Sequence, residues 1–187
     1  EIVISHIRQA NRGCVSLVNT HPFSRELWGR YWTYAHNGQL TDYQATFSVS
    51  RFQPVGDTDS ELAFCWILES VVNKFGEFEP ENMNEVFQYI SQLADEIRQL
   101  GVFNMLLSNG IDLMTYCTNN LCHITRRAPF GQATLIDTDV VIDFSQETTP
   151  NDVVTVIATR PLTNNENWVV LQPGEWKLFR KGELING

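Results

Sequence analysis

The sequence predicts an α+β domain in which two adjacent helices pack on a largely antiparallel system of β-sheets. Two helical patterns occupy the middle of the chain, at about residues 58–76 and 82–101, and short strand-like runs come before and after them. This order of strands, two helices and then many strands is typical of the α+β class. The chain has 187 residues, which fits one domain spanning 1–187.

The first helix is indicated by its start and stop signals. Thr58 is the candidate N-cap, and Glu61 follows three residues later, as in a capping box. Gly76 provides the C-terminal stop. Between these points the apolar face consists of Leu62, Cys65, Trp66 and Leu68.

The second helix is expected to begin near Asn82, with Glu85 three residues on, and to end at Gly101. Apolar residues recur at helical spacing between these points: Val86, Tyr89, Ile90, Leu93, Ala94 and Ile97. Both helices should therefore pack on a sheet through their apolar faces.

Strand-like runs mark most of the remaining chain, and Gly, Pro and Asn turn signals separate them. A turn is expected at Asn37-Gly38, followed by a loop over residues 39–56. The expected strands are 2–8, 14–18, 31–35, 102–107, 112–117, 121–126, 133–136, 139–144, 153–158, 168–171 and 176–180.

The composition argues against several classes of function. With 43% hydrophobic and 19% charged residues, the chain supports a packed core and is not of the disordered class. The formal net charge of −9 repels a phosphate backbone, so we expect no nucleic-acid partner. No apolar run approaches the ~20 residues that a membrane-spanning helix needs, so we expect no membrane partner.

The four cysteines, Cys14, Cys65, Cys117 and Cys122, indicate reduced structural thiols and a cytoplasmic location. Cys117 and Cys122 are the only close pair in the sequence. Their Cys-x4-Cys spacing, without a second pair, is not a zinc signature. We therefore expect no metal and no other cofactor.

Polar residues gather in the first third of the chain, at the ends of strand-like runs, where sites tend to be built. Arg8 could present its guanidinium to a carboxylate ligand, or pair with a nearby acid such as Asp57. Asn37 and Gly38 could form a two-donor anion hole from a side-chain amide and a backbone N–H, or an ordinary turn. His36 could be a general base or a buried histidine at a strand end.

Asp57 and Asp59 flank the start of the first helix. A carboxylate there can bind a substrate ammonium group, or it can cap the helix and complement its dipole. His6, His21 and His36 could form a metal cluster with these acids, although their spacings match no standard ligand motif.

Arg160 belongs to the last polar motif, residues 158–163, which is followed by Glu166 and Trp168. The motif ends the strong strand pattern of residues 153–158. Arg160 either pairs with an acid near the site or simply marks the exit from that strand.

The order and spacing of these motifs resemble the glutaminase domain of the class II glutamine amidotransferases, which are N-terminal-nucleophile (Ntn) enzymes. The resemblance is closest to the stand-alone bacterial YafJ-like branch and extends over essentially all 187 residues. It implies a four-layer αββα sandwich, with two antiparallel sheets between helical layers. The matching motifs are His6-x-Arg8, Asn19-Thr20-His21-Pro22, His36-Asn37-Gly38, Thr58-Asp59-Ser60-Glu61, residues 157–163 and Pro173-Gly174-Glu175-Trp176.

The resemblance also implies a reaction. An N-terminal cysteine attacks the side-chain amide of glutamine, with its own α-amino group as the base, and ammonia leaves before the glutamyl thioester is hydrolysed. Carried over by motif, Arg8 binds the α-carboxylate of glutamine and Asp59 binds its α-ammonium group. The Asn37 side chain and the Gly38 N–H form the oxyanion hole.

Further residues follow from the same resemblance. Asn11 and His36 are expected at the substrate pocket. The family often has Thr where this chain has Asn11, and an aromatic residue where it has Gln9, so another γ-glutamyl amide is an alternative substrate. The ammonia is expected to pass to a partner protein or a small-molecule acceptor. Supporting roles are expected for His6, His21 and Arg160.

The nucleophile is the main departure from the family pattern. The chain begins with Glu1, inside a strand-like run, so we expect that an upstream portion of the domain carries the cysteine. Cys14 cannot replace it, because Cys14 follows the strand and has no free α-amine. Two alternatives remain: a catalytically inactive Ntn-fold module that binds an amino-acid-like ligand or a protein partner, and a metal hydrolase built on His6, His21 and His36.

Overall fold

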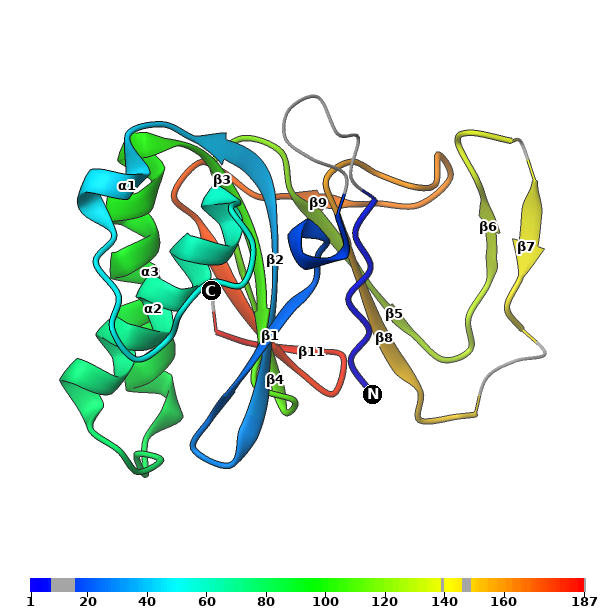
Figure 1. The fold of residues 1–187 in the computed structure, drawn as a ribbon. Coiled ribbons are helices and arrows are strands. Elements are labelled where there is room, and N and C mark those ends of the chain that lie inside the picture. The colour runs from blue at the N-terminus through cyan, green and yellow to red at the C-terminus, as the bar shows by residue number, and fades with distance from the viewer. Residues whose placement is uncertain (8–15, 139, 146–148, 187) are drawn as a thin grey trace.

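The structure is a computed structural model that describes residues 1–7, 16–138, 140–145 and 149–186. These residues form an α+β fold in which helices cover one face of a six-stranded sheet and two smaller sheets lie beyond its other face (Figure 1). The paired strands of all three sheets run antiparallel. The predicted α+β class with antiparallel sheets is confirmed.

The six-stranded sheet is built from both ends of the chain. Its first four strands follow one another in sequence, and the two C-terminal strands add to the free side of the fourth. In spatial order the strands are β1 (Phe23–Leu27), β2 (Arg30–Leu40), β3 (Gly101–Ser108), β4 (Asp112–Tyr116), β10 (Trp176–Arg180) and β11 (Glu183–Asn186).

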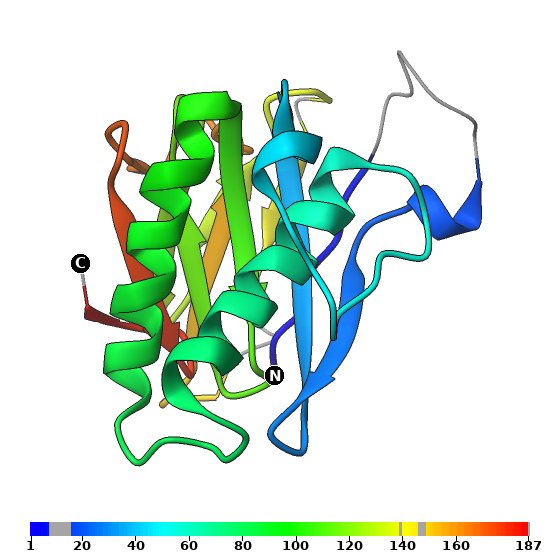
Figure 2. The ribbon, with the colours of Figure 1, turned by 60° about the vertical axis from the view of Figure 1, so that its left-hand side comes forward.

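The two predicted helices are confirmed as α2 (Asp59–Phe75) and α3 (Met83–Ile97), which lie together on the sheet (Figure 2). The Thr58 hydroxyl accepts the backbone N–H of Glu61 at 3.1 Å, so the predicted N-cap is correct. The shorter helical segments are η1 (Leu17–Asn19), α1 (Tyr43–Thr46) and η2 (Arg98–Leu100).

Aromatic side chains fill the core between this helical layer and the sheet. Trp32 and Tyr34 of β2 are fully buried. Tyr34 stacks on Phe64 of α2 with ring centroids 4.9 Å apart, and Trp32 lies 5.9 Å from Phe87 of α3. Large aromatic contacts of this kind contribute much of a core's stabilisation, and here they fix β2 against the start of α2.

The three-stranded sheet contacts the large one through its side chains. The Thr155 hydroxyl donates to the Gly182 carbonyl at 2.6 Å, and the His123 ring meets Phe179 at 5.2 Å. One small sheet has the order β8 (Val153–Ala158), β5 (Cys122–Arg127), β9 (Val169–Val170), and the other pairs β6 (Gln132–Thr134) with β7 (Val141–Asp143).

Two predicted N-terminal strands are wrong where the structure describes them. Residues 2–7 have no regular secondary structure, and residues 17–19 form the 3-10 helix η1. Residues 8–15, which complete these two predictions, lie outside the described residues. A strand needs a partner, and no described strand pairs with residues 2–7, so their Ile and Val content was an insufficient signal.

The predicted Asn37-Gly38 turn is also wrong, because both residues lie inside β2. The chain turns instead at Trp28-Gly29, where φ is 58° and 76°, and this two-residue turn joins β2 to the unpredicted strand β1. The loop expected over residues 39–56 begins only after Leu40 and contains α1. Strand β11 was also not predicted.

Two further expectations concern compartment and membrane. Cys65, Cys117 and Cys122 are free and buried, whereas Cys14 lies outside the described residues. In the described part of the chain, no helix has the length and apolar character needed to cross a membrane. The cytoplasmic location stays a prediction.

Candidate functional site

The central motif of the site, His36-Asn37-Gly38, lies in the second half of β2. This half pairs with β3, so that Asn37 is opposite Asn104 and Gly38 is opposite Phe103. Successive side chains of a strand point to opposite faces. The His36 ring accordingly faces α2, while Asn37 lies on the other face of the sheet and is exposed.

His36 is buried and engages the protein through both ring nitrogens. Nε2 lies 3.0 Å from the Val102 carbonyl oxygen, and Nδ1 lies 2.8 Å from the Ser60 hydroxyl of α2. A carbonyl only accepts, so Nε2 carries the proton and Nδ1 of the neutral ring accepts from Ser60. Burial lowers the pKa of His36 and favours this neutral form, although the Val102 bond and the charge of Asp59 oppose the shift.

Gly38 has no room for a side chain. A Cβ atom there would lie 1.8 Å from the Val102 carbonyl oxygen and 2.6 Å from Nε2 of His36. The His36 ring therefore occupies the space beside Gly38 on the same face of β2. This close packing explains why His and Gly occur two residues apart in the motif.

The ladder pattern shows where the Gly38 N–H points. In a regular strand, successive residues direct their backbone groups to alternate edges. The Thr41 N–H donates toward β3, to the Leu100 carbonyl at 2.8 Å, whereas the Leu40 N–H donates to Asp59 at 2.8 Å. Gly38 has the same parity as Leu40, so its N–H points away from β3.

We call this side of β2, from His36 to Leu40 and facing away from β3, the outer edge. Strand β1 pairs with β2 only as far as Tyr34, so no described strand covers the outer edge. The Gly38 N–H and the exposed Asn37 residue are therefore placed where a substrate could approach.

Asp59 lies at the outer edge because the start of α2 packs against it. One carboxylate oxygen accepts the Leu40 N–H, and the other accepts the Ser60 N–H at 2.8 Å and lies 3.2 Å from the Ser60 hydroxyl oxygen, whose proton points to His36. The side chain is half-buried, and carboxylate oxygens can accept more than one donor. Asp59 thus joins helix to strand while retaining capacity for a ligand.

His6 and His21 form an aromatic pair beside this region. Their ring centroids are 4.3 Å apart, and the buried His21 ring also meets Phe23 at 4.6 Å and Tyr34 at 6.5 Å. His6 also lowers the pKa of His36 as a minor contribution, after burial. Both predicted supporting histidines therefore lie near the His36 end of the site.

Arg8 and Asn11, two predicted substrate-binding residues, lie outside the described residues. Their roles, and the alternative pairing of Arg8 with Asp57, stay predictions. Asp57 itself is held by Asn19, whose amide nitrogen donates to its carboxylate at 2.6 Å.

The metal-cluster alternative finds no support in the geometry. Nowhere in residues 1–7, 16–138, 140–145 and 149–186 do three His, Cys, Asp or Glu side chains come together as a metal site.

A surface depression of about 530 Å³ near Trp28 and Phe78 has none of the predicted site residues in its lining. The candidate site is therefore the outer edge of β2 with the start of α2.

Comparison with known proteins shows the family to which the chain belongs. The family model described as "Glutamine amidotransferases class-II" matches residues 1–187. YafJ of Escherichia coli (strain K12), whose name assigns it to the glutamine amidotransferases, is 64% identical over 183 residues, which are 98% of this chain and 71% of YafJ. The chain belongs to the class II glutamine amidotransferases.

The fold of this amidotransferase is also similar to the folds of solved structures. The crystal structure of a predicted glutamine amidotransferase from Pseudomonas aeruginosa PA01 has a TM-score of 0.86 and 54% identity, covering 97% of this chain and 70% of that one. Glutamine phosphoribosylpyrophosphate amidotransferase from B. subtilis shares the fold, with a TM-score of 0.55 and 14% identity over 92% of this chain and 32% of that one. The Ntn-type fold expected from the motifs is confirmed.

The described ion pair of Arg160 in this amidotransferase does not involve the other predicted site residues. It follows β8, its side chain is 77% exposed, and its ion pair is with Asp137 at 3.6 Å. The motif around it has a structural role: Glu166 binds Arg126 and the Thr163 hydroxyl, which accepts from the Trp168 indole at 2.9 Å. A supporting role of Arg160 in the site stays a prediction.

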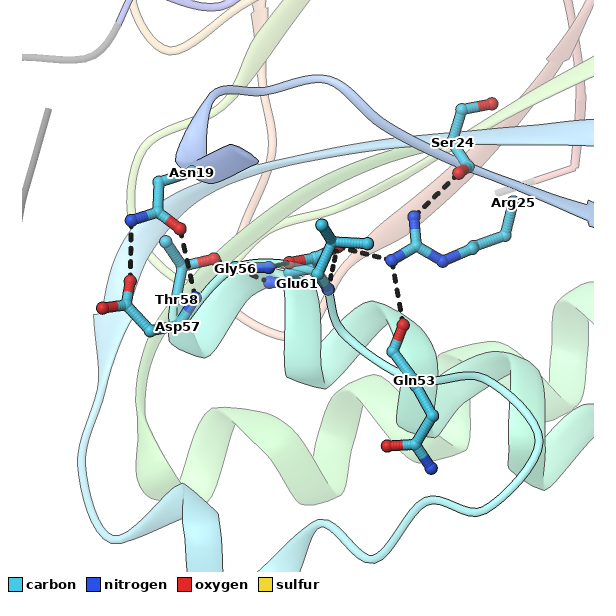
Figure 3. Close-up of polar contacts among 9 residues, drawn as sticks. Asn19, Ser24, Arg25, Gln53, Gly56, Asp57, Thr58 and Glu61 are labelled. Atoms are coloured by element: carbon cyan, nitrogen blue, oxygen red, sulfur yellow. Dashed lines mark hydrogen bonds and ion pairs between the residues drawn. The ribbon is translucent and has the colours of Figure 1, made fainter. Parts of the chain in front are cut away.

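A polar network that was not predicted from the sequence braces the start of α2 (Figure 3). The carboxylate of Glu61, 2% exposed, pairs with Arg25 of β1 and accepts the N–H groups of Val55 at 3.0 Å and Gly56 at 2.7 Å. In an ordinary capping box this carboxylate accepts the N–H of the N-cap residue itself. Glu61 instead accepts N–H groups two and three residues before the N-cap residue Thr58.

Asn19 completes the network from the other side. Its amide oxygen accepts the Asp57 N–H at 3.1 Å, while its amide nitrogen donates to the Asp57 carboxylate. A Cβ atom on Gly56 would lie 2.1 Å from the Asn19 amide oxygen, so only glycine fits there. The motif residues Asn19 and Glu61 were visible signals in the sequence, whereas nothing in it pointed to Arg25.

Proposed function

We propose that this amidotransferase hydrolyses the side-chain amide of glutamine and releases ammonia through a cysteine thioester. Asn37 and Gly38 supply the oxyanion hole, Asp59 binds the α-ammonium group, and Arg8 binds the α-carboxylate. His36, with Asn11, borders the pocket and holds Gly38 in place. The nucleophile is the N-terminal cysteine of the family, which is not among these 187 residues.

The observation that carries this proposal is the shared edge of Gly38 and Leu40. Asp59 accepts the Leu40 N–H at 2.8 Å, and the Gly38 N–H points from the same edge two residues earlier. Two residues of a strand span about 7 Å. The α-nitrogen and the amide carbon of glutamine are four bonds apart, roughly 5 Å when extended. A glutamine bound along this edge can therefore reach Asp59 with its ammonium group and Gly38 with its amide oxygen.

The residues of the site would act at defined steps. Asp59 and Arg8 orient the substrate, so the amide carbon meets the thiolate in a near-attack geometry. Negative charge then develops on the amide oxygen, where the Gly38 N–H and the Asn37 amide donate hydrogen bonds. The α-amine of the nucleophilic cysteine takes the thiol proton and delivers it to the departing ammonia.

The neutral His36 ring contributes by position rather than by proton transfer. Both of its nitrogens already bind Ser60 and Val102. The ammonia would be used by a partner protein or a small-molecule acceptor, and another γ-glutamyl amide could replace glutamine as substrate. The chemistry requires no metal or organic cofactor.

The experiment uses the protein expressed from its complete gene and a diazo-ketone analogue of glutamine. Intact-mass spectrometry before and after incubation should show one analogue-sized adduct, located on a peptide that begins with cysteine. Glutamine turnover should yield glutamate and ammonia in equal amounts. Asn37→Ala should lower kcat by roughly 10²–10³-fold, and Asn73→Ala, at an exposed position of α2, serves as the matched control.

A protein that forms no adduct and releases no ammonia would refute the proposed reaction. Binding of glutamine without turnover, measured by calorimetry, would then favour the inactive Ntn-fold module. Faster turnover of another γ-glutamyl amide than of glutamine would keep the mechanism and change the substrate.

A further inference from the structure

Asn104 of β3 is a buried polar residue that the proposed mechanism does not use. Its side chain lies opposite Asn37 in the antiparallel ladder, and directly opposed residues share one face of a sheet. That face is the one away from the helical layer, where the exposed Asn37 side chain lies.

The amide of Asn104 makes a full set of hydrogen bonds. Its oxygen accepts the backbone N–H groups of Thr118 at 2.9 Å, Asn119 at 3.2 Å and Asn120 at 3.4 Å. Its nitrogen donates to the Asn119 side-chain oxygen at 2.8 Å and to the Asn37 carbonyl at 3.0 Å. Three N–H donors on one side fix the orientation of the amide, so its nitrogen must face the Asn37 carbonyl.

The Asn37 carbonyl belongs to the same peptide group as the Gly38 N–H. Its oxygen points toward β3, and the N–H points to the outer edge. A hydrogen bond to the carbonyl fixes the plane of that peptide and polarises it, which makes the N–H a stronger donor. Buried groups of this kind have few alternative partners, so the bond constrains the peptide strongly.

We propose that Asn104 is a positioning residue for the oxyanion hole, holding the Asn37–Gly38 peptide and tying it to the turn at residues 118–120. This inference rests on the proposed function, because it concerns the donor that this function assigns to Gly38. Asn104 touches neither substrate nor nucleophile in this scheme and acts only through the peptide.

Two variants separate this role from simple anchoring of the turn. Asn104→Asp keeps the oxygen that accepts the turn N–H groups, but it replaces the nitrogen that donates to the Asn37 carbonyl and to the Asn119 side chain with an acceptor. Thr118→Val does the opposite: it removes the hydroxyl that donates to the Phe103 carbonyl at 2.7 Å and accepts the Phe103 N–H at 3.1 Å, while Asn104 still contacts Asn37. Both variants are made in the protein expressed from its complete gene.

We expect the two variants to differ in kcat and not in KM. Asn104→Asp should lower kcat for glutamine by roughly 10- to 100-fold, as expected for a misplaced catalytic group, with KM essentially unchanged. Thr118→Val should keep kcat even if its melting temperature falls. An equal fall of kcat in both variants would overturn the proposal, because anchoring of the turn alone would then explain it.

A second readout does not depend on activity. The backbone amide of Gly38 is followed by ¹⁵N NMR in both variants. Loss of the bond to the Asn37 carbonyl should move the Gly38 nitrogen resonance upfield in Asn104→Asp but not in Thr118→Val. An unchanged Gly38 amide in Asn104→Asp contradicts the proposal. A wild-type protein without glutaminase activity would instead refute the proposed function, and the amide measurement still decides the role of Asn104.

Discussion

The carboxylate of Asp59, the first residue of α2, accepts the backbone N–H of Leu40, the last residue of β2, at 2.8 Å. This bond joins two segments that are separated by the loop holding α1. It also fixes the acidic group of the site relative to Gly38, which lies two residues earlier on the same edge. A change at either end should therefore affect substrate binding and the oxyanion hole together.

Asp59→Asn should weaken glutamine binding. Asparagine can keep its oxygen on the Leu40 N–H, but its amide nitrogen then meets the Ser60 N–H that the second carboxylate oxygen accepts. It also loses the charge proposed to bind the substrate ammonium. Hydrogen bonds to charged groups contribute about 1.5–3 kcal/mol, so kcat/KM should fall roughly 10- to 100-fold. Steady-state kinetics measures the change. Asp137→Asn, which removes only the exposed ion pair with Arg160, should leave kcat/KM unaltered.

Gly38→Ala should destabilise the protein and abolish glutaminase activity. The new methyl group would collide with the Val102 carbonyl oxygen and the His36 ring, and overpacking of this kind costs about 1–3 kcal/mol. Urea unfolding measures the loss. Gly131→Ala is the control, because no atom lies within 4 Å of its added Cβ. Equal stability of the two variants would show that β2 adjusts without strain.

Arg25→Met should destabilise the start of α2. Removing one partner of a buried ion pair costs about 3–5 kcal/mol, and we expect the lower end of that range because the Arg25 side chain is 21% exposed while that of Glu61 is 2% exposed. The unfolding free energy in urea measures the effect. Arg51→Met removes a comparable pair with Glu77 at the exposed surface and should have little effect.

Stability should fall as the pH is lowered through the ordinary histidine range. Burial lowers the pKa of His36 below its usual 6.5, and burial together with Lys177 lowers the pKa of His123. The unfolded chain then takes up protons first, so stability is full above pH 6.5 and is lost as the pH falls toward the lowered values. The Arg126 hydrogen bond lowers the pKa of Glu166, so that carboxylate adds a loss only in more acidic solution.

Urea unfolding at about pH 7.5 and about pH 5.5 measures this dependence. His36→Gln and His123→Gln each remove one titrating ring and should each reduce the loss between the two conditions. The same loss in the wild type and in the double variant would show that other groups govern stability in this range.

The sequence predicted the helices and most of the C-terminal strands because their signals are local. Thr58 and Gly76 bound α2, and apolar periodicity identifies α3. Strands β1 and β11 were missed because short edge strands owe their conformation to the strand beside them. Residues 2–7 show the opposite error: their apolar run predicted a strand, but they form no strand in the described structure.

The motifs in the sequence were sufficient to identify the family, because their His, Asn, Gly and Asp residues follow the order and spacing of the family along the whole chain. They did not determine the conformation of Asn37-Gly38, a dipeptide that locally favours a turn. Pairing with β3 and the His36 ring beside Gly38 select the extended form.

The tertiary structure alone determined which distant residues meet. Leu40 and Asp59 are 19 positions apart, Arg25 and Glu61 are 36 apart, and Asn37 and Asn104 are 67 apart. No local propensity encodes such contacts. The first two arise where α2 packs on the sheet, and the third arises where β2 and β3 pair. The order of the motifs was enough to predict the family and its chemical groups, whereas the packing of α2 and β3 against β2 fixes where those groups point.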